Sequence, residues 1–154
     1  MDRRPEKTIT TNRKAWHDYH VEDRFEAGIV LTGTEVKSLR QGRASLVDAY
    51  GKIEKGEMWL VNAHIPPFKQ ASFFNHEPRR KRKLLMHASQ IRRLTGKIVE
   101  KGLTLIPLRV YFSGPYVKVE LGLCRGKRQY DKRTAIKERD SRREVERTLS
   151  ERNR

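Results

Sequence analysis

Apolar side chains are concentrated between Val21 and Cys124 of this chain, and few of them follow. The segment 126–154 carries 11 Lys or Arg and 6 Asp or Glu, a net charge of 11 − 6 = +5. A segment with so little apolar surface cannot build a core of its own. The sequence therefore predicts one folded domain over residues 12–125 and a basic C-terminal tail that is disordered when free. We expect the polar residues 1–11 to form a disordered basic arm.

Alternation of apolar and polar residues predicts several short β-strands within the domain. The expected strands cover residues 24–31, 46–50, 58–65, 106–112 and 117–123, with a turn at Ser113–Pro115 joining the last two into a hairpin. A short helix is expected from Thr34 to about Arg40, and a longer amphipathic helix carries Ile91, Leu94 and Ile98 and ends before Gly102. This pattern favours a mainly β fold with flanking helices, in the form of a small antiparallel barrel. An open α+β sandwich is the alternative.

The formal net charge of the chain is +16, from 35 Lys and Arg against 19 Asp and Glu. Such a charge attracts polyanions through counterion release, so nucleic acid is the first partner class and an anionic membrane surface the second. No apolar run approaches the roughly 20 residues that a membrane span requires. No apolar signal-peptide core follows the basic N-terminus. We therefore expect a cytoplasmic protein without a membrane partner.

The side chains that enzymes use do not come together in the sequence. His17 and His20 lie three residues apart on an expected strand and would point to opposite faces. Cys124 is the only cysteine, which excludes an intramolecular disulfide and a thiolate zinc site within one chain, so a packing role is expected. We expect a binding protein with no catalytic residues, no cofactor and no metal. A ribonuclease that depends on His17 or His64 is the enzymatic alternative.

Two groups of residues are candidates for general RNA contact. The basic run Arg79–Lys83 is either a solvated loop or a phosphate contact that does not read sequence. Aromatic residues near basic groups can stack on bases if they are exposed. These aromatic residues are Trp16, Tyr19, Tyr111 and Tyr130.

Glu26 lies on the polar face of an expected strand in a strongly basic protein. Its carboxylate would repel phosphate, but it could accept hydrogen bonds from a guanine or cytosine edge in unpaired RNA. The alternative is a cross-strand ion pair with Arg24 or Lys118, which strand statistics favour.

Five segments in this order closely resemble the small protein B family of bacterial partners of transfer-messenger RNA. They are Asn12–Tyr19, Phe25–Gly42, Arg80–His87, Leu103–Phe112 and Gly126–Arg133. The resemblance implies an oligonucleotide-binding-like barrel that binds the tRNA-like domain of transfer-messenger RNA and stands where an anticodon arm would be. It also implies delivery to ribosomes stalled without a stop codon, with the tail entering the empty mRNA channel beyond the small-subunit decoding centre and becoming helical there. A general ribosomal RNA-binding or ribosome-assembly protein is the alternative.

The resemblance also implies roles for individual residues and for partners. Those matched to RNA engagement are Asn12, Glu26, Leu85 and Lys118, with Leu85 acting through its loop; this shifts the expectation for Glu26 toward an RNA contact. Those matched to the tail's ribosomal role are Gly126, Lys127, Tyr130, Asp131, Lys132 and Arg133, and His17 and Arg40 fall in ribosome-facing segments. Tyr130 stands where some relatives have histidine, so stacking is retained but an imidazolium charge is not. Elongation factor Tu and alanyl-tRNA synthetase are expected to act only through the RNA, the protein to be a monomer, and DNA to be no partner.

Overall fold

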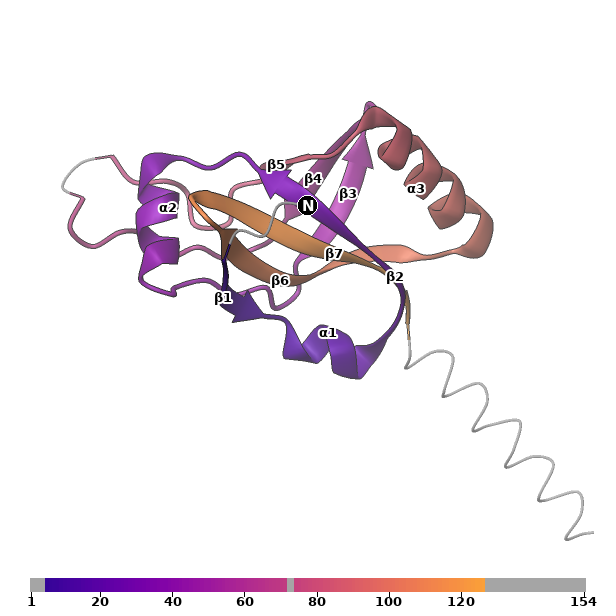
Figure 1. Cartoon of the computed structure of the whole chain (residues 1–154), viewed down its shortest axis with the longest axis horizontal. Coiled ribbons are helices and arrows are strands. Elements are labelled where there is room, and N and C mark those ends of the chain that lie inside the picture. Colours follow the sequence, from indigo (N-terminus) through magenta and orange to yellow (C-terminus); the bar gives the residue numbers. More distant parts are fainter. Residues whose placement is uncertain (1–4, 72–73, 127–154) are drawn as a thin grey trace, which may run out of the picture.

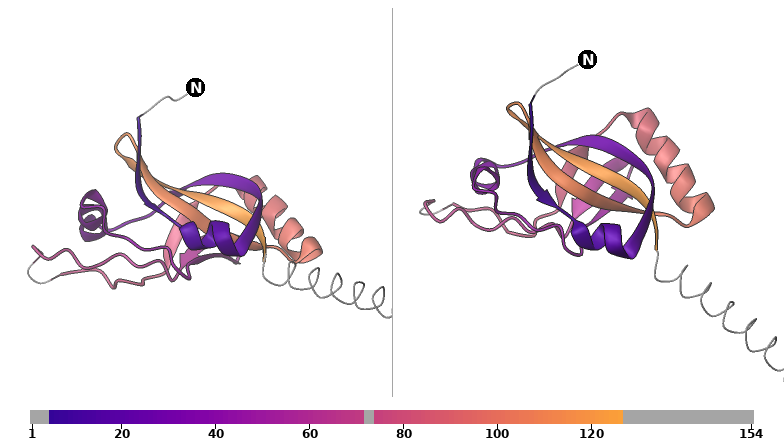
Figure 2. Two further views of the ribbon diagram at one scale, coloured as in Figure 1. Left: turned by 90° about the horizontal axis from the view of Figure 1, so that it is seen from below. Right: turned by 60° about the horizontal axis from the view of Figure 1, so that its bottom comes forward.

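The structure is a computed structural model that describes residues 5–71 and 74–126. Its strands are β1 (Glu6–Thr11), β2 (Tyr19–Ile29), β3 (Tyr50–Glu54), β4 (Glu57–Val61), β5 (Arg82–Leu85), β6 (Thr104–Ser113) and β7 (Tyr116–Gly126). Its helices are α1 (Arg13–Asp18), α2 (Gly33–Arg40) and α3 (Ala88–Lys101). Helices α2 and α3 lie on opposite sides of the β-structure (Figures 1 and 2).

Six of the strands close into a ring. Going around it, β6 pairs with β3, followed by β4, β5, β2 and β7, and β7 pairs back to β6. Each of these pairings is antiparallel, and Figure 2 shows the resulting barrel from two sides. The join between β3 and β6 is narrow, because it consists of the pair Gly51 and Leu105. The predicted barrel with flanking helices is confirmed, and each of its six strands is paired to a neighbour on both sides.

The barrel interior is filled by the apolar faces of the strands and of α3. Val119, Leu121 and Leu123 of β7 point inward as their alternation predicts. In β6 the register shifts between Pro107 and Arg109. Because of this shift, the alternating apolar residues of β6 pack into one cluster before it and into another cluster after it. Val110 faces the barrel interior, whereas Ile106 and Leu108 pack under α1 with Ala15 and Cys124.

Cys124 is fully buried in this second cluster, which confirms the packing role predicted for it. Burial raises the pKa of the thiol to about 11, so it stays protonated at neutral pH.

The prediction that residues 1–11 form a disordered arm is wrong for Glu6–Thr11, which form β1. This strand lies along β6, with Thr8 opposite Tyr111 and Thr11 opposite Arg109. The cause is visible in the composition, because β-branched residues fill most of the segment and suit a pleated strand. Ile9 packs against the barrel core and supplies the apolar anchor.

Other elements also differ from the prediction, and the strand expected over 24–31 covers Tyr19–Ile29. The strand expected over 46–50 begins only at Tyr50, because Asp48, with φ of 63°, lies in a turn. The strand expected over 58–65 ends at Val61, because Asn62 has a φ of 66°. His17 lies on α1 and His20 on β2, whereas both were expected on one strand.

The hairpin of β6 and β7 and the amphipathic helix α3 are confirmed. Gly102 ends α3 in the left-handed conformation, with a φ of 62°. Among the described residues, no helix has the length and apolar content needed to cross a membrane.

Candidate nucleic-acid interface

Three of the four residues matched to RNA engagement meet at one surface hollow. Glu26 comes from β2, Leu85 from β5 and Lys118 from β7, and they come together because β2 pairs with both other strands. Gly28 is the partner of Leu85 on one side and of Lys118 on the other. A Cβ atom at position 28 would be in ordinary van der Waals contact with the Cβ atom of Leu85, at 3.4 Å. The hollow is also lined by Met86, His87 and Gln90.

The Glu26 carboxylate is held by two donors. The ammonium of Lys118 donates to Oε1 at 2.5 Å, and the hydroxyl of Tyr111 donates to Oε2. Lys118 and then Tyr111 lower the pKa of Glu26, so it is ionised at neutral pH. Half of the Glu26 side chain remains exposed. The predicted ion pair with Lys118 is therefore present, and the carboxylate still faces solvent.

Leu85 provides an exposed apolar side chain beside these charges, with 54% of its surface accessible. It is the last residue of β5, and two residues further along the chain His87 caps the start of α3. An RNA ligand in this hollow would meet a cation, a carboxylate and an apolar contact within one small area.

Asn12 lies elsewhere and is 5% exposed. Its side-chain oxygen caps α1 by accepting from the backbone of Ala15, and its amide donates to the carbonyls of Leu46 and Pro107. These bonds occupy the side chain inside the protein. The structure therefore gives Asn12 the task of fixing α1 onto the barrel.

The residues matched to ribosome contact lie apart from the hollow. His17 is on α1 with its ring beside Asp18, and Arg40 is the exposed last residue of α2. Gly126 ends β7 and lines a second hollow with Asn12 and Tyr50. The remaining tail positions, namely Lys127, Tyr130, Asp131, Lys132 and Arg133, lie outside the described residues.

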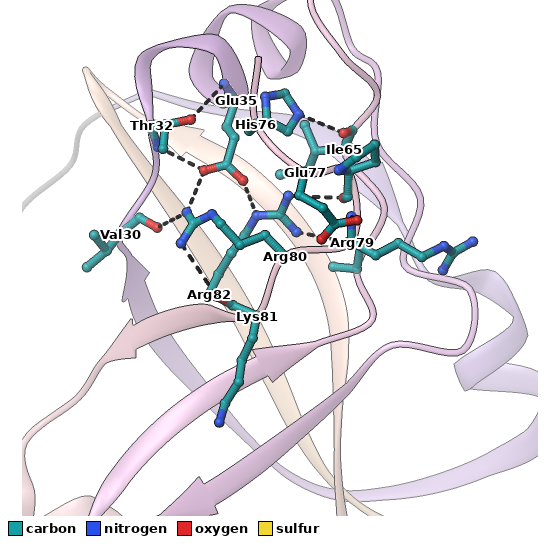
Figure 3. Close-up of polar contacts among 12 residues, drawn as sticks. Val30, Thr32, Glu35, Ile65, His76, Glu77, Arg79, Arg80, Lys81 and Arg82 are labelled. Carbon is teal, nitrogen blue, oxygen red and sulfur yellow. Dashed lines mark hydrogen bonds and ion pairs between the residues drawn. The ribbon is translucent and has the colours of Figure 1, made fainter. Parts of the chain in front are cut away.

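The basic run Arg79–Lys83 is not a uniformly solvated loop. Arg82 is fully buried, and its guanidinium donates to the carboxylate of Glu35, which is also fully buried. Arg80 donates to the same carboxylate at 2.6 Å, as Figure 3 shows. Two of the five basic residues thus serve an internal ion cluster, and the prediction of phosphate contact does not hold for Arg82.

The Glu35 cluster ties α2 to the barrel. Arg82 also donates to the carbonyls of Ala63 and Pro78, and Glu35 accepts from the backbone of Thr32 in a capping box (Figure 3). Burial by itself would raise the pKa of Glu35, but hydrogen bonds from Arg80, Thr32 and Arg82 outweigh it and lower the pKa. Sequence reasoning missed this cluster. The available signal was the sequence Thr32 to Glu35, which has the spacing of a capping box.

The aromatic candidates for base stacking differ in how far they are exposed. Trp16 is 39% exposed, and the guanidinium of Arg24 lies over its ring at 4.8 Å from the centroid. Tyr19 is half-buried against the cluster under α1. Tyr111 is only 1% exposed, so it does not meet the condition of exposure and is not available to stack on bases. Tyr130 lies outside the described residues.

The closed barrel and the charged surface hollow define a small, basic protein of the oligonucleotide-binding-like barrel class. Comparison with known protein families identifies the family within this class. The family model of the SmpB protein matches residues 9–151, and the chain belongs to this family.

Individual relatives agree with this assignment. The SsrA-binding protein of Carboxydothermus hydrogenoformans is 58% identical over 144 residues, which is 94% of this chain and 97% of the relative. That of Acidothermus cellulolyticus is 61% identical over 146 residues, 95% of this chain and 92% of the relative. A solved chain described as "tmRNA-SmpB: a journey to the center of the bacterial ribosome" is 51% identical. It has a TM-score of 0.66 and is matched over 77% of this chain and 83% of its own length.

Proposed function

We propose that this protein binds transfer-messenger RNA and acts in trans-translation on stalled ribosomes in the bacterial cytoplasm. The observation that carries the proposal is the hollow where Glu26, Leu85 and Lys118 meet on a basic barrel. Relatives covering nearly the whole chain are SsrA-binding proteins, which supports the same partner. The protein acts as a binding adaptor and catalyses no bond chemistry itself.

The hollow suits a folded RNA with an unpaired, exposed base. Lys118 neutralises a phosphate or donates to a base, and the free lone pairs of Glu26 accept from a base N–H. Leu85 packs against the ribose or the base face. The tRNA-like domain of transfer-messenger RNA is the ligand, because its loops present unpaired bases in a fixed shape. Arg92 and Arg93 on the exposed side of α3 add phosphate contacts that do not depend on sequence.

The tail has a separate task in this proposal. Residues 126–154 enter the empty mRNA channel from the small-subunit decoding centre and become helical there. Their net charge of +5 favours a groove lined by ribosomal RNA. His17 and Arg40 face the ribosome from the barrel side.

Other components act through the RNA. Elongation factor Tu and alanyl-tRNA synthetase recognise the RNA and contact this protein only indirectly. In this proposal the protein works as a monomer, and DNA is no partner.

A binding competition tests the proposal against the alternative of a general ribosomal RNA-binding protein. Labelled transfer-messenger RNA is titrated with the protein at physiological salt, with ribosomal RNA fragments of similar length as competitors. We expect a preference of at least about 100-fold for transfer-messenger RNA, corresponding to about 2.7 kcal/mol. Equal affinity for all structured RNA would support the general RNA-binding protein instead.

Replacing Lys118 with Gln is expected to weaken binding of transfer-messenger RNA about 10-fold or more. A hydrogen bond to a charged group is worth about 1.5–3 kcal/mol, and this substitution removes the cation from the hollow. The matched control is Lys52→Gln on β3, which also removes one charge from an ion pair with Glu54. Filter binding measures both variants. An equal loss in the two variants would mean that only overall charge matters.

A further inference from the structure

The side chain that orients Glu26 is Tyr111. It lies on β6 opposite Lys118 of β7, and its hydroxyl donates to Oε2 of Glu26. The tyrosine is 1% exposed, whereas Glu26 keeps half of its side chain in solvent. The buried hydroxyl of Tyr111 thus donates to the exposed carboxylate of Glu26 from the protein side, while Lys118 binds the other carboxylate oxygen.

Tyr111 is itself held in place by Arg109. The guanidinium lies over the tyrosine ring, 3.9 Å from its centroid. Arg109 is fixed in turn by Glu120 of β7 at 2.7 Å and by Glu6 of β1 at 3.1 Å. A stacked guanidinium with two carboxylate partners leaves the ring little freedom to rotate.

We propose that Tyr111 is a positioning residue for RNA recognition, which fixes the Glu26 carboxylate so that its remaining lone pairs face the bound RNA. This inference rests on the proposed function, in which Glu26 accepts a hydrogen bond from the RNA. A carboxylate has about four acceptor sites, and Tyr111 and Lys118 occupy two of them. The carboxylate therefore keeps acceptor capacity in a fixed orientation, and the cost of ordering it on binding is reduced.

The strand β1 contributes to the same arrangement. Glu6 and Thr8 both accept from Arg109, so β1 supports the guanidinium that covers Tyr111. The N-terminal strand is thereby connected to the RNA hollow through three side chains in succession.

The test compares Tyr111→Phe with Glu26→Gln and with the double variant. Phe keeps the ring under Arg109 and removes only the hydroxyl. We expect Tyr111→Phe to weaken binding of transfer-messenger RNA about 2- to 10-fold, the loss typical of having to order one side chain on binding. Adding it to Glu26→Gln is expected to weaken binding no further, because the hydroxyl acts only through that carboxylate.

The control is Tyr50→Phe, which removes a hydroxyl from a 40% exposed tyrosine on β3. It is expected to bind like the unaltered protein. Circular dichroism melting of each variant identifies any loss of folded protein, so affinities are compared at equal folded concentrations. Additive losses in the double variant would overturn the inference, because a general structural role does not require Glu26.

A second readout is the titration of Glu26 in the free protein, followed by carboxyl NMR. Lys118 and Tyr111 together lower its pKa from 4.5, so removing the hydroxyl is expected to raise it toward that value. RNA binding through the carboxylate is lost as pH falls through the folded pKa, so Tyr111→Phe should lose it at a higher pH.

Other charges near Glu26 are Arg24 on β2 itself, Glu120 on β7 and Arg109 on β6, with His87 across the hollow. These groups are all retained in Glu26→Gln. The pH dependence of RNA binding by that variant therefore serves as the baseline against which the contribution of Glu26 is measured. An unchanged Glu26 titration in Tyr111→Phe would overturn the inference.

The outcomes separate the inference from the function on which it rests. Weak binding by Glu26→Gln with normal binding by Tyr111→Phe overturns the inference alone. Normal binding by Glu26→Gln overturns the inference and the role of Glu26, but leaves transfer-messenger RNA as the partner. If the unaltered protein shows no preference for transfer-messenger RNA over other structured RNA, the proposed function is overturned.

Discussion

Replacing Glu35 with Gln is expected to destabilise the folded protein by about 3–5 kcal/mol, the usual cost of leaving a buried charge without its partner. Glu35 and Arg82 are both fully buried, and Gln keeps the shape of the side chain while removing its charge. Domains of this size are stable by about 5–15 kcal/mol, so the substitution would consume a large part of the margin. Urea unfolding followed by circular dichroism measures the change.

The matched control is Glu57→Gln, which removes the same charge from a surface pair with Lys83. Both partners of that pair are more than 40% exposed, and such pairs contribute about 0–1 kcal/mol. Equal destabilisation by the two variants would show that the buried cluster has no special energetic role. The double variant Glu35→Leu with Arg82→Met should be less unstable than Glu35→Gln, because it removes both buried charges together.

The pH dependence of stability follows from the lowered pKa of Glu35. Its stabilising contribution is fully present above its ordinary value of 4.5 and is lost as pH falls through the lower folded value. The difference in stability between the unaltered protein and Glu35→Gln is therefore expected to shrink as pH falls through that value, which urea unfolding at a series of pH values measures.

Deleting residues 127–154 is expected to abolish tagging on stalled ribosomes while leaving binding of transfer-messenger RNA nearly unchanged. The reason is that Glu26, Leu85 and Lys118 all lie on the barrel, whereas the tail acts only on the ribosome in the proposed function. Tagging is measured in a reconstituted translation reaction on an mRNA without a stop codon. RNA binding is measured in parallel by filter binding.

The control for tail deletion is a tail with the same composition in shuffled order. It keeps the net charge of +5, so it restores any general attraction to RNA. We expect it to bind transfer-messenger RNA normally and to remain inactive in tagging. Full activity of the shuffled tail would mean that charge is sufficient, and collapse of RNA binding on deletion would contradict the division of tasks.

The barrel was predictable because its strands alternate in the ordinary way. The last hairpin and the amphipathic helix with Gly102 could be identified from periodicity and turn residues. The ends of strands were less predictable, since Asp48 and Asn62 adopt positive φ values that no pattern of hydrophobicity indicates. The strand β1 was missed because its one core residue, Ile9, gives almost no alternation.

The candidate site was predictable only in part. Family resemblance named Glu26, Leu85 and Lys118, and the pairing of β2 with β5 and β7 brings them together. The resemblance could not indicate that Asn12 works from inside the protein, because a motif does not reveal burial. Tyr111 and Arg82 were misjudged for a related reason, since a residue beside charges in sequence is not necessarily exposed in the fold.

The pairing of β1 with β6 has a consequence for the biogenesis of the protein. Glu6 pairs with Ser113, and Tyr19 of β2 pairs with Gly126. The strands that are synthesised first therefore pair with the strands that are synthesised last. During synthesis β1 and β2 emerge long before their partners and remain unpaired, a condition that favours aggregation. Such high contact order slows barrel formation. The nascent chain is therefore expected to depend on chaperones until residues 104–126 have left the exit tunnel.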